Sequence, residues 1–73
     1  MVFFISRRQN MKQRILAHLG QNDKGNSMVM EAGSNGRTYY ALYIGAALLD
    51  CFPVDHDEAE DWLQRKMREN HMA

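Results

Sequence analysis

Residues 55–70, DHDEAEDWLQRKMREN, decide the fold of this 73-residue chain, because every local rule for a helix agrees within them. Asp55 is a good N-cap residue, and Glu58 follows at the capping-box position three residues later. Acidic side chains crowd the first turns and basic side chains the last turns, where the helix dipole favours each charge. An apolar stripe at helical spacing is formed by Ala59, Trp62, Leu63 and Met67. We therefore expect an amphipathic helix over residues 55–70 whose apolar side packs on a sheet.

The segment before this helix, residues 27–52, has the period of two that is typical of strands. Its strongest strand is 38–44, TYYALYI, which is rich in aromatic and β-branched side chains. A strand over residues 28–32 precedes it. Two glycines and an asparagine in residues 33–36 favour a hairpin turn between these strands.

A third strand is expected over residues 47–52, after a tight turn at Gly45 and Ala46. Pro53 ends the pairing because it has no N–H to donate. Good helix formers between Ala46 and Leu49 leave a short helix there as an alternative. The favoured interpretation is a three-stranded antiparallel sheet of two hairpins with the C-terminal helix packed on it, which is an α+β fold.

A further helix, on the N-terminal side of the sheet, is predicted over residues 11–20. Asn10 is a good N-cap, and Gly20 stands where a left-handed residue commonly ends a helix. One face of this helix would carry Met11, Ile15, Leu16 and Leu19. The helix would cover the same sheet face as the C-terminal helix or lie across a sheet edge. Residues 1–10 are either a loosely ordered extension, with the native start at Met11, or a short apolar plug.

Length and composition predict one small domain over residues 1–73, located in the cytoplasm. A chain of 8.5 kDa buries little surface, so disulfides, a metal or self-association commonly stabilise domains of this size. The single cysteine, Cys51, excludes an internal disulfide and fits a reducing compartment. A homodimer is therefore one expectation. The start of the chain lacks the features of a secretory signal, and the weakly apolar residues 41–49 are too few to span a bilayer.

The residue pattern contains no catalytic, cofactor or metal signature, so we expect a non-enzymatic protein without a cofactor. His18, His56 and His71 are too widely spaced to match a known type of metal site. The acidic residues 55–61 lack the central glycine and terminal glutamate of a calcium-binding loop. Cys51 has no neighbouring base or positive charge that would activate it as a nucleophile.

Two features of the sequence favour a contact surface for another protein. Tyr39 and Tyr43 fall on the opposite strand face from Leu42, and exposed tyrosines beside a small alanine are typical of protein interfaces. The acidic start of the C-terminal helix is suited to a basic groove on a partner. The candidate interface residues are Tyr39, Tyr43, Asp57, Glu60 and Asp61. The leading hypothesis is a small interaction or regulatory protein that binds a protein partner or a second copy of itself.

The alternative function is DNA binding or transcription regulation through the basic N-terminal helix. Its candidate phosphate contacts are Arg7, Arg8, Lys12 and Arg14. The net charge of the whole chain is zero, which gives no general attraction to nucleic acid. Nucleic acid is therefore the less favoured partner.

Three short motifs resemble the N-terminal DNA-binding arm domains of phage-type integrases. They are Gly36-Arg-Thr-Tyr-Tyr-Ala-Leu-Tyr-Ile-Gly45, Cys51-Phe-Pro53 and Glu58-Ala-Glu-Asp-Trp-Leu63, and together with their surroundings they cover roughly half of the chain. The resemblance implies a three-stranded sheet with a packed helix and sheet residues that contact DNA, although these strands lack the lysines and arginines of that family. The size is also similar to that of small phage and prophage accessory proteins, which implies an inhibitor or modulator of a host protein.

Overall fold

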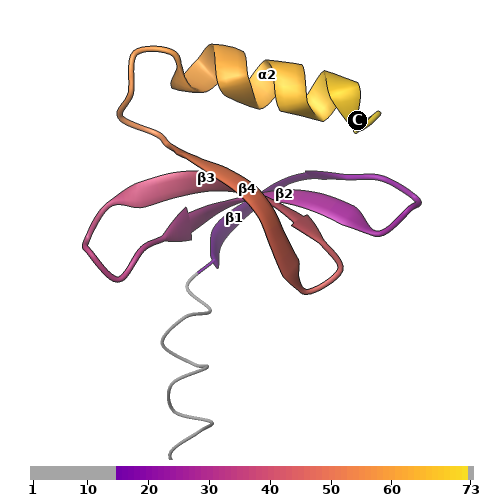
Figure 1. Ribbon diagram of the computed structural model, residues 1–73, viewed down its shortest axis with the longest axis horizontal. Helices are drawn as coiled ribbons and strands as arrows, with labels where there is room; N and C mark the ends of the chain where they lie inside the picture. The colour runs from indigo at the N-terminus through magenta and orange to yellow at the C-terminus, as the bar shows by residue number, and fades with distance from the viewer. Residues whose placement is uncertain (1–14, 73) are drawn as a thin grey trace, which may run out of the picture.

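The computed structural model describes residues 15–72, where an antiparallel sheet carries a helix across one of its faces (Figure 1). Along the chain the elements are β1 (Ile15–Gln21), β2 (Asn26–Ala32), β3 (Thr38–Ile44), β4 (Ala47–Pro53) and α2 (Ala59–Glu69). The strands lie in sequence order, so each neighbouring pair forms a hairpin. The predicted α+β class, with an antiparallel sheet and a C-terminal helix, is confirmed, but the sheet has four strands instead of three.

The β2–β3 hairpin turns over residues 33–36, where its glycines and asparagine predict a turn. The Gly33 N–H donates to the Arg37 carbonyl oxygen at 2.7 Å, and the Arg37 N–H donates to the Asn35 side chain at 2.9 Å. Gly36 has a φ of 86°, a left-handed value that side chains disfavour. The strand predicted over residues 38–44 is confirmed as β3.

The β3–β4 hairpin excludes the alternative helix between Ala46 and Leu49. Ala47 lies opposite Ile44, and Gly45 makes the turn between them with a φ of 61°. Pro53 is the last residue of β4, as its missing N–H predicts. The third predicted strand is therefore confirmed as β4.

The helix predicted over residues 11–20 is wrong where the structure describes it, because Ile15–Gln21 forms β1. Gly20, expected to end a helix, lies opposite Met28 of β2. Two register shifts in β1 interrupt the period of two, so its apolar residues also match helical spacing. Hydrogen bonding to β2 makes Ile15–Gln21 a strand and not a helix, because tertiary contacts override a weak local propensity. Residues 1–14, with the expectations for 1–10, lie outside the described residues.

The predicted capping box at the start of the C-terminal helix is also wrong, and α2 begins only at Ala59. The Asp55 carboxylate accepts a hydrogen bond from the Arg37 guanidinium on the β2–β3 hairpin at 2.9 Å. This hydrogen bond lowers the pKa of Asp55 and raises that of Arg37. Glu58 occupies the N-cap position without a side-chain capping bond, and its own N–H donates to His56 Nδ1 at 3.0 Å. The Asp55 carboxylate, which the sequence predicts as the helix cap, therefore pairs with Arg37 of the β2–β3 hairpin instead.

The core lies between α2 and one face of the sheet. Trp62 and Leu63 of α2 are buried against Met28 of β2 and Leu42 of β3. The Phe52 ring of β4 stacks on the Trp62 ring with their centroids 5.3 Å apart. The predicted apolar stripe of the C-terminal helix is therefore confirmed as core.

The end of α2 is closed by a Schellman motif. The Met72 N–H donates to the Met67 carbonyl oxygen at 2.9 Å, and the His71 N–H donates to the Arg68 carbonyl oxygen at 3.1 Å. His71 takes the left-handed position of this motif, with a φ of 55°. Met72 then packs against the core, so the end of the described chain stays on the sheet side of α2.

Candidate functional site

The sheet face turned away from α2 is covered by no helix or strand of residues 15–72, and we call it the open face (Figure 1). Side chains alternate between the two faces along a strand. Met28 and Leu42 point to α2, so their neighbours Val29 and Tyr43 point to the other side. Cross-strand pairing extends this set, and the open face is defined by Ile15, His18, Val29, Glu31, Tyr39, Tyr43, Leu48 and Cys51.

Large aliphatic side chains stay exposed on and beside the open face. Ile15 is 39% exposed and Leu48 is 53% exposed. Leu49, an extra residue where the β3–β4 pairing shifts register, is 59% exposed. Leu42, which points to α2, is 1% exposed. Ile15 on β1 and Leu48 and Leu49 on β4 therefore leave exposed apolar surface at both edges of the sheet.

A shallow hollow of about 150 Å³ lies on the open face between β1 and the β3–β4 turn. It is lined by Ile15, His18, Ser27, Val29, Tyr43, Gly45 and Ala46. Val29 forms its buried floor, with only 2% of its surface exposed. Sites for drug-sized ligands and cofactors usually enclose about 300–1,000 Å³, so this hollow is too small for one. Its lining combines apolar side chains with the polar groups of His18, Ser27 and Tyr43.

Both predicted tyrosines lie on the open face, half-buried and hydrogen-bonded. The Tyr43 hydroxyl donates to the Glu31 carboxylate, and the Tyr39 hydroxyl accepts from the Asn35 amide at 2.9 Å. Burial, reinforced by the hydrogen bond to Glu31, raises the pKa of Tyr43 to about 12. These hydrogen bonds therefore hold both tyrosine rings in position, and the Glu31 carboxylate accepts one of them.

The raised pKa of Tyr43 predicts a loss of stability in alkali. The folded state holds the Tyr43 proton more tightly than the unfolded chain does. The stabilisation that comes from this proton is therefore complete below the ordinary tyrosine pKa of 10.0 and is lost as the pH rises through about 12. We expect the free energy of unfolding to fall by an amount on the order of 1 kcal/mol, because the ring is partly exposed. Urea unfolding across this pH range measures the fall. Tyr43→Phe should reduce this fall, and an unchanged fall in the variant would contradict the assignment to Tyr43.

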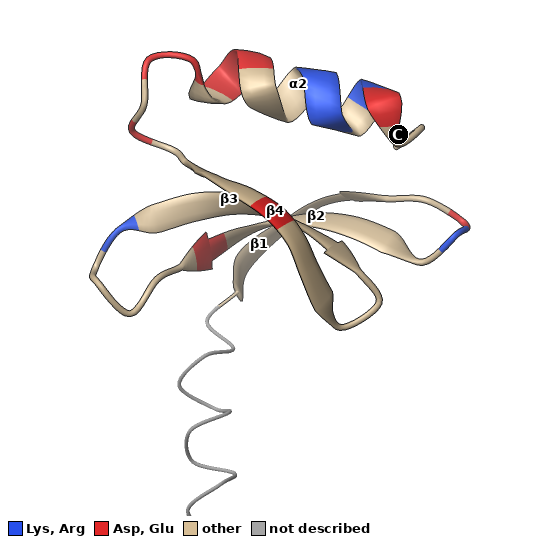
Figure 2. Ribbon diagram, viewed as in Figure 1, with Lys and Arg blue, Asp and Glu red and all other residues tan. Residues whose placement is uncertain are grey.

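The acidic half of the predicted interface is separated from the tyrosine half. Asp57, Glu60 and Asp61 are exposed at the start of α2, on the other side of the sheet from the open face (Figure 2). Asp61 pairs with Arg65 at 3.2 Å, and Glu60 accepts from the Gln64 amide at 3.3 Å. The structure therefore does not bring the five candidate interface residues together on one surface.

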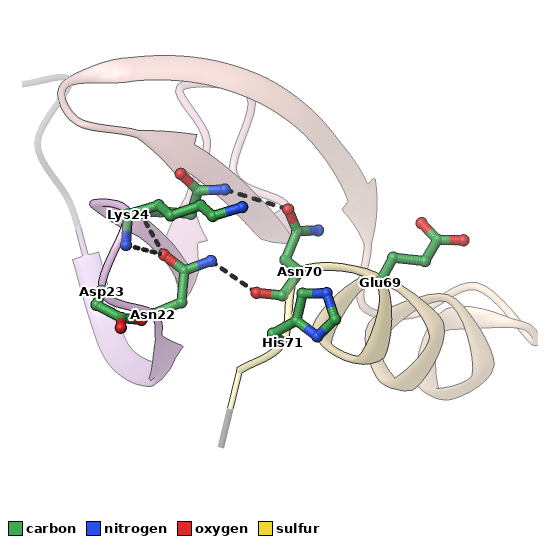
Figure 3. A pocket seen from close by; sticks show the side chains of 7 residues that line it. Asn22, Asp23, Lys24, Glu69, Asn70 and His71 are labelled. Atoms are coloured by element: carbon green, nitrogen blue, oxygen red, sulfur yellow. Dashed lines mark hydrogen bonds between the residues drawn. The ribbon is translucent and has the colours of Figure 1, made fainter.

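A second hollow, of about 330 Å³, lies where the β1–β2 turn meets the end of α2 (Figure 3). Three asparagines join its two walls, and we call them the amide latch. The Asn22 amide donates to the Asn70 carbonyl oxygen at 2.6 Å, and the Asn26 amide donates to Asn70 Oδ1 at 3.2 Å. The Asn70 amide donates in turn to the Lys66 carbonyl oxygen at 2.8 Å. These amides are occupied within the protein, so the latch holds the helix end on the turn.

Replacing Asn70 with alanine is expected to lower the free energy of unfolding by about 1–2 kcal/mol. The change removes the Oδ1 acceptor of Asn26 and the amide donor to Lys66, each worth about 1 kcal/mol net. Glu69→Ala is the matched control, since the exposed Glu69 makes only a 3.9 Å contact to Lys66 and its removal should change stability by less than about 0.5 kcal/mol. Equal denaturation midpoints for the two variants would show that the latch contributes nothing.

Lysine and arginine are absent from all four strands and lie instead in turns and on α2 within the described residues (Figure 2). A sheet that contacts nucleic acid needs such cations against the phosphates. The predicted phosphate contacts Arg7, Arg8, Lys12 and Arg14 fall outside the described residues. The DNA-binding alternative therefore stays a prediction from sequence.

The candidate metal ligands lie in different regions of the described structure. His18 lines the hollow of the open face, His56 precedes α2, and His71 follows it. Between Ile15 and Met72, no group of three or more histidine, cysteine, aspartate or glutamate side chains is placed to hold a metal ion. In the same range, no helix has the length and apolar character needed to cross a membrane.

Comparisons with known proteins assign no family to this arrangement. Neither a protein-family model, nor a curated protein, nor a solved structure matches the chain. The resemblance to integrase arm domains stays a prediction from three motifs. The function is therefore argued from the surface of the described residues.

Sequence reasoning finds the tyrosines of the open face and misses the aliphatic side chains around them. A helix over residues 11–20 assigns Ile15 to a different surface, although its β-branched side chain favours a strand. Leu48 and Leu49 are consecutive, so alternation alone cannot place both on one side. The signal for the amide latch is absent from the sequence pattern, because Asn22 and Asn70 are 48 residues apart.

Proposed function

We propose that this chain is a small non-enzymatic interaction protein that binds another protein chain through its open face. The observation that carries this proposal is the exposure of Ile15 and Leu48 on the same sheet face as two half-buried tyrosines, a face that α2 leaves uncovered. Burying apolar surface releases about 25 cal/mol per Å², and fixed aromatic rings add contact area at low entropic cost. Binding of this kind can inhibit or modulate the partner by occupying its surface.

The edges of the sheet are less suited to binding than its open face. On β4, the Cys51 N–H donates to the Asp50 carboxylate at 2.9 Å, and Pro53 has no N–H. The same Asp50 carboxylate lies 3.4 Å from the Lys66 ammonium, which places a charged pair near this edge. On β1, two register shifts disturb the edge. Charges, proline and bulges are the devices that prevent strand addition, which favours a partner on the open face.

Affinity capture with matched variants tests this proposal. The immobilised full chain is exposed to a lysate of the cells that naturally make it, alongside Leu48→Lys and Glu60→Lys. Leu48 and Glu60 are both exposed, so neither substitution should prevent folding, and thermal unfolding checks this. A captured protein should be lost with Leu48→Lys and retained with Glu60→Lys. The opposite result would move the contact to the acidic start of α2 and overturn the assignment to the open face.

Titration of labelled DNA at low salt completes the test. Protein binding through the open face predicts no micromolar DNA affinity for the full chain. Tight binding that disappears when Arg7, Arg8, Lys12 and Arg14 are replaced by alanine would overturn the proposal in favour of the DNA-binding alternative.

A further inference from the structure

We propose that Asn35, in the turn of the β2–β3 hairpin, is a site of spontaneous deamidation. The reaction converts its side-chain amide to a carboxyl group and needs only water as a co-reactant. It goes beyond the proposed function, because it depends on no partner of the open face. Asn35 and Gly36 are both exposed, so water has free access to the reacting atoms.

The residue that follows Asn35 makes its amide reactive. Deamidation begins when the main-chain nitrogen of the next residue attacks the asparagine side-chain carbon, and a side chain on that next residue hinders the attack. The sequence contains five asparagines, and only Asn35 is followed by glycine. Gly36 has no Cβ, and only its chain neighbours lie within 4 Å of the place where one would stand. The attacking nitrogen is therefore least hindered at Asn35.

The reaction runs in two steps, the first of which releases ammonia. The Gly36 nitrogen bonds to Asn35 Cγ while its proton passes through water to Nδ2, the Cγ–Nδ2 bond breaks, and Nδ2 leaves as ammonia. The product is a cyclic imide. Water then adds to one of the two carbonyl carbons of the imide and opens the ring. Opening at Cγ gives aspartate, and opening at the main-chain carbonyl carbon gives isoaspartate, whose main chain runs through Cγ.

The hairpin holds this reactive amide by both of its polar atoms. Asn35 Oδ1 accepts a hydrogen bond from the Arg37 N–H at 2.9 Å, and Asn35 Nδ2 donates to the Tyr39 hydroxyl at 2.9 Å. The N–H of the attacking Gly36 donates to the Gly33 carbonyl oxygen at 3.1 Å. These bonds must open before the Gly36 nitrogen can reach Cγ. The folded turn therefore slows a reaction that its own sequence makes possible.

Conversion of Asn35 acts on the open face through Tyr39. Aspartate and isoaspartate have no amide N–H to donate to the Tyr39 hydroxyl, so this ring loses one of its restraints. Each product also adds a negative charge near Arg37, whose guanidinium pairs with Asp55 at 2.9 Å. Isoaspartate in addition lengthens the main chain inside a turn that is closed by the Gly33 N–H to the Arg37 carbonyl oxygen.

Ageing of the full chain at neutral pH and body temperature, followed by peptide mass spectrometry, tests the site. Trypsin cleaves after Lys24 and Arg37, so the peptide of residues 25–37 contains both Asn35 and Asn26. We expect aspartate and isoaspartate to accumulate at Asn35 while Asn26 stays an amide, and Asn35→Gln should abolish the gain. An unaged sample digested in parallel corrects for conversion during digestion. No acid at Asn35, or equal conversion of both asparagines, would overturn the proposal.

Two matched variants test the restraint by the hairpin. Tyr39→Phe removes the acceptor of the Asn35 amide and should speed deamidation about 2- to 10-fold, the factor expected for the loss of one hydrogen bond. Tyr43→Phe removes a hydroxyl that bonds to Glu31 on the same strand face, and should leave the rate unchanged. Circular dichroism checks that both variants are folded. Equal deamidation rates in the two variants would overturn the role of Tyr39 in holding the amide.

Discussion

Replacing Trp62 with alanine is expected to lower the free energy of unfolding by about 3–5 kcal/mol. The Trp62 side chain is 6% exposed and stacks on Phe52, so the change removes a large ring buried between α2 and the sheet. It also removes the ring that lies 5.8 Å from the Lys66 ammonium. Domains of this size have little stability to spare, so most of the protein should be unfolded at moderate temperature.

Thermal unfolding followed by circular dichroism measures this effect. Trp62→Phe is the conservative comparison, since a phenyl ring retains some of the stacking on Phe52 and should recover more than half of the loss. Gln64→Ala, on the exposed side of α2, should change stability by less than about 0.5 kcal/mol. A Trp62→Ala protein that melts with the parent would show that α2 is not docked through this ring.

The second large effect is expected for Leu42→Ala, which should cost about 2–5 kcal/mol. Leu42 is 1% exposed at the centre of the sheet and belongs to one core cluster with Met28 and Trp62. Truncation leaves a cavity that β3 cannot close, because it is hydrogen-bonded to a strand on each side.

Leu16→Ala provides the matched control for this prediction. It removes the same atoms from a β1 side chain that is 56% exposed, so the expected cost is below about 1 kcal/mol. Urea unfolding of both variants gives the comparison. Equal costs at the two positions would contradict the placement of the core between α2 and the sheet.

The sequence predicts the features of the fold that depend on local pattern. The strand over residues 38–44 and the turns at Gly36 and Gly45 are confirmed, because aromatic residues and positive φ angles act locally. The apolar stripe through Trp62 is also confirmed, since helical spacing identifies a buried face without knowledge of what covers it.

The wrong predictions concern features that depend on distant residues. Asp55 has a strong local preference to cap a helix, but Arg37 from the hairpin takes its carboxylate. Ile15 and Gly20 match a helix until β2 is present to pair with them. The candidate site is divided for the same reason. The acids and the tyrosines are predicted from the sequence as interface residues, and only the packing of α2 shows that they lie on opposite sides of the sheet.

The amide latch has a consequence for how the chain folds. Every strand of the described sheet pairs with its neighbour in sequence, so the sheet can form by successive hairpin closures over short loops. The latch instead joins residues 48 and 44 positions apart, and it can close only after α2 has returned across the sheet. Its bonds should therefore be absent from the folding transition state. Loss of the latch would then speed unfolding and leave the folding rate nearly unchanged, which makes Asn70 a determinant of the lifetime of the native state.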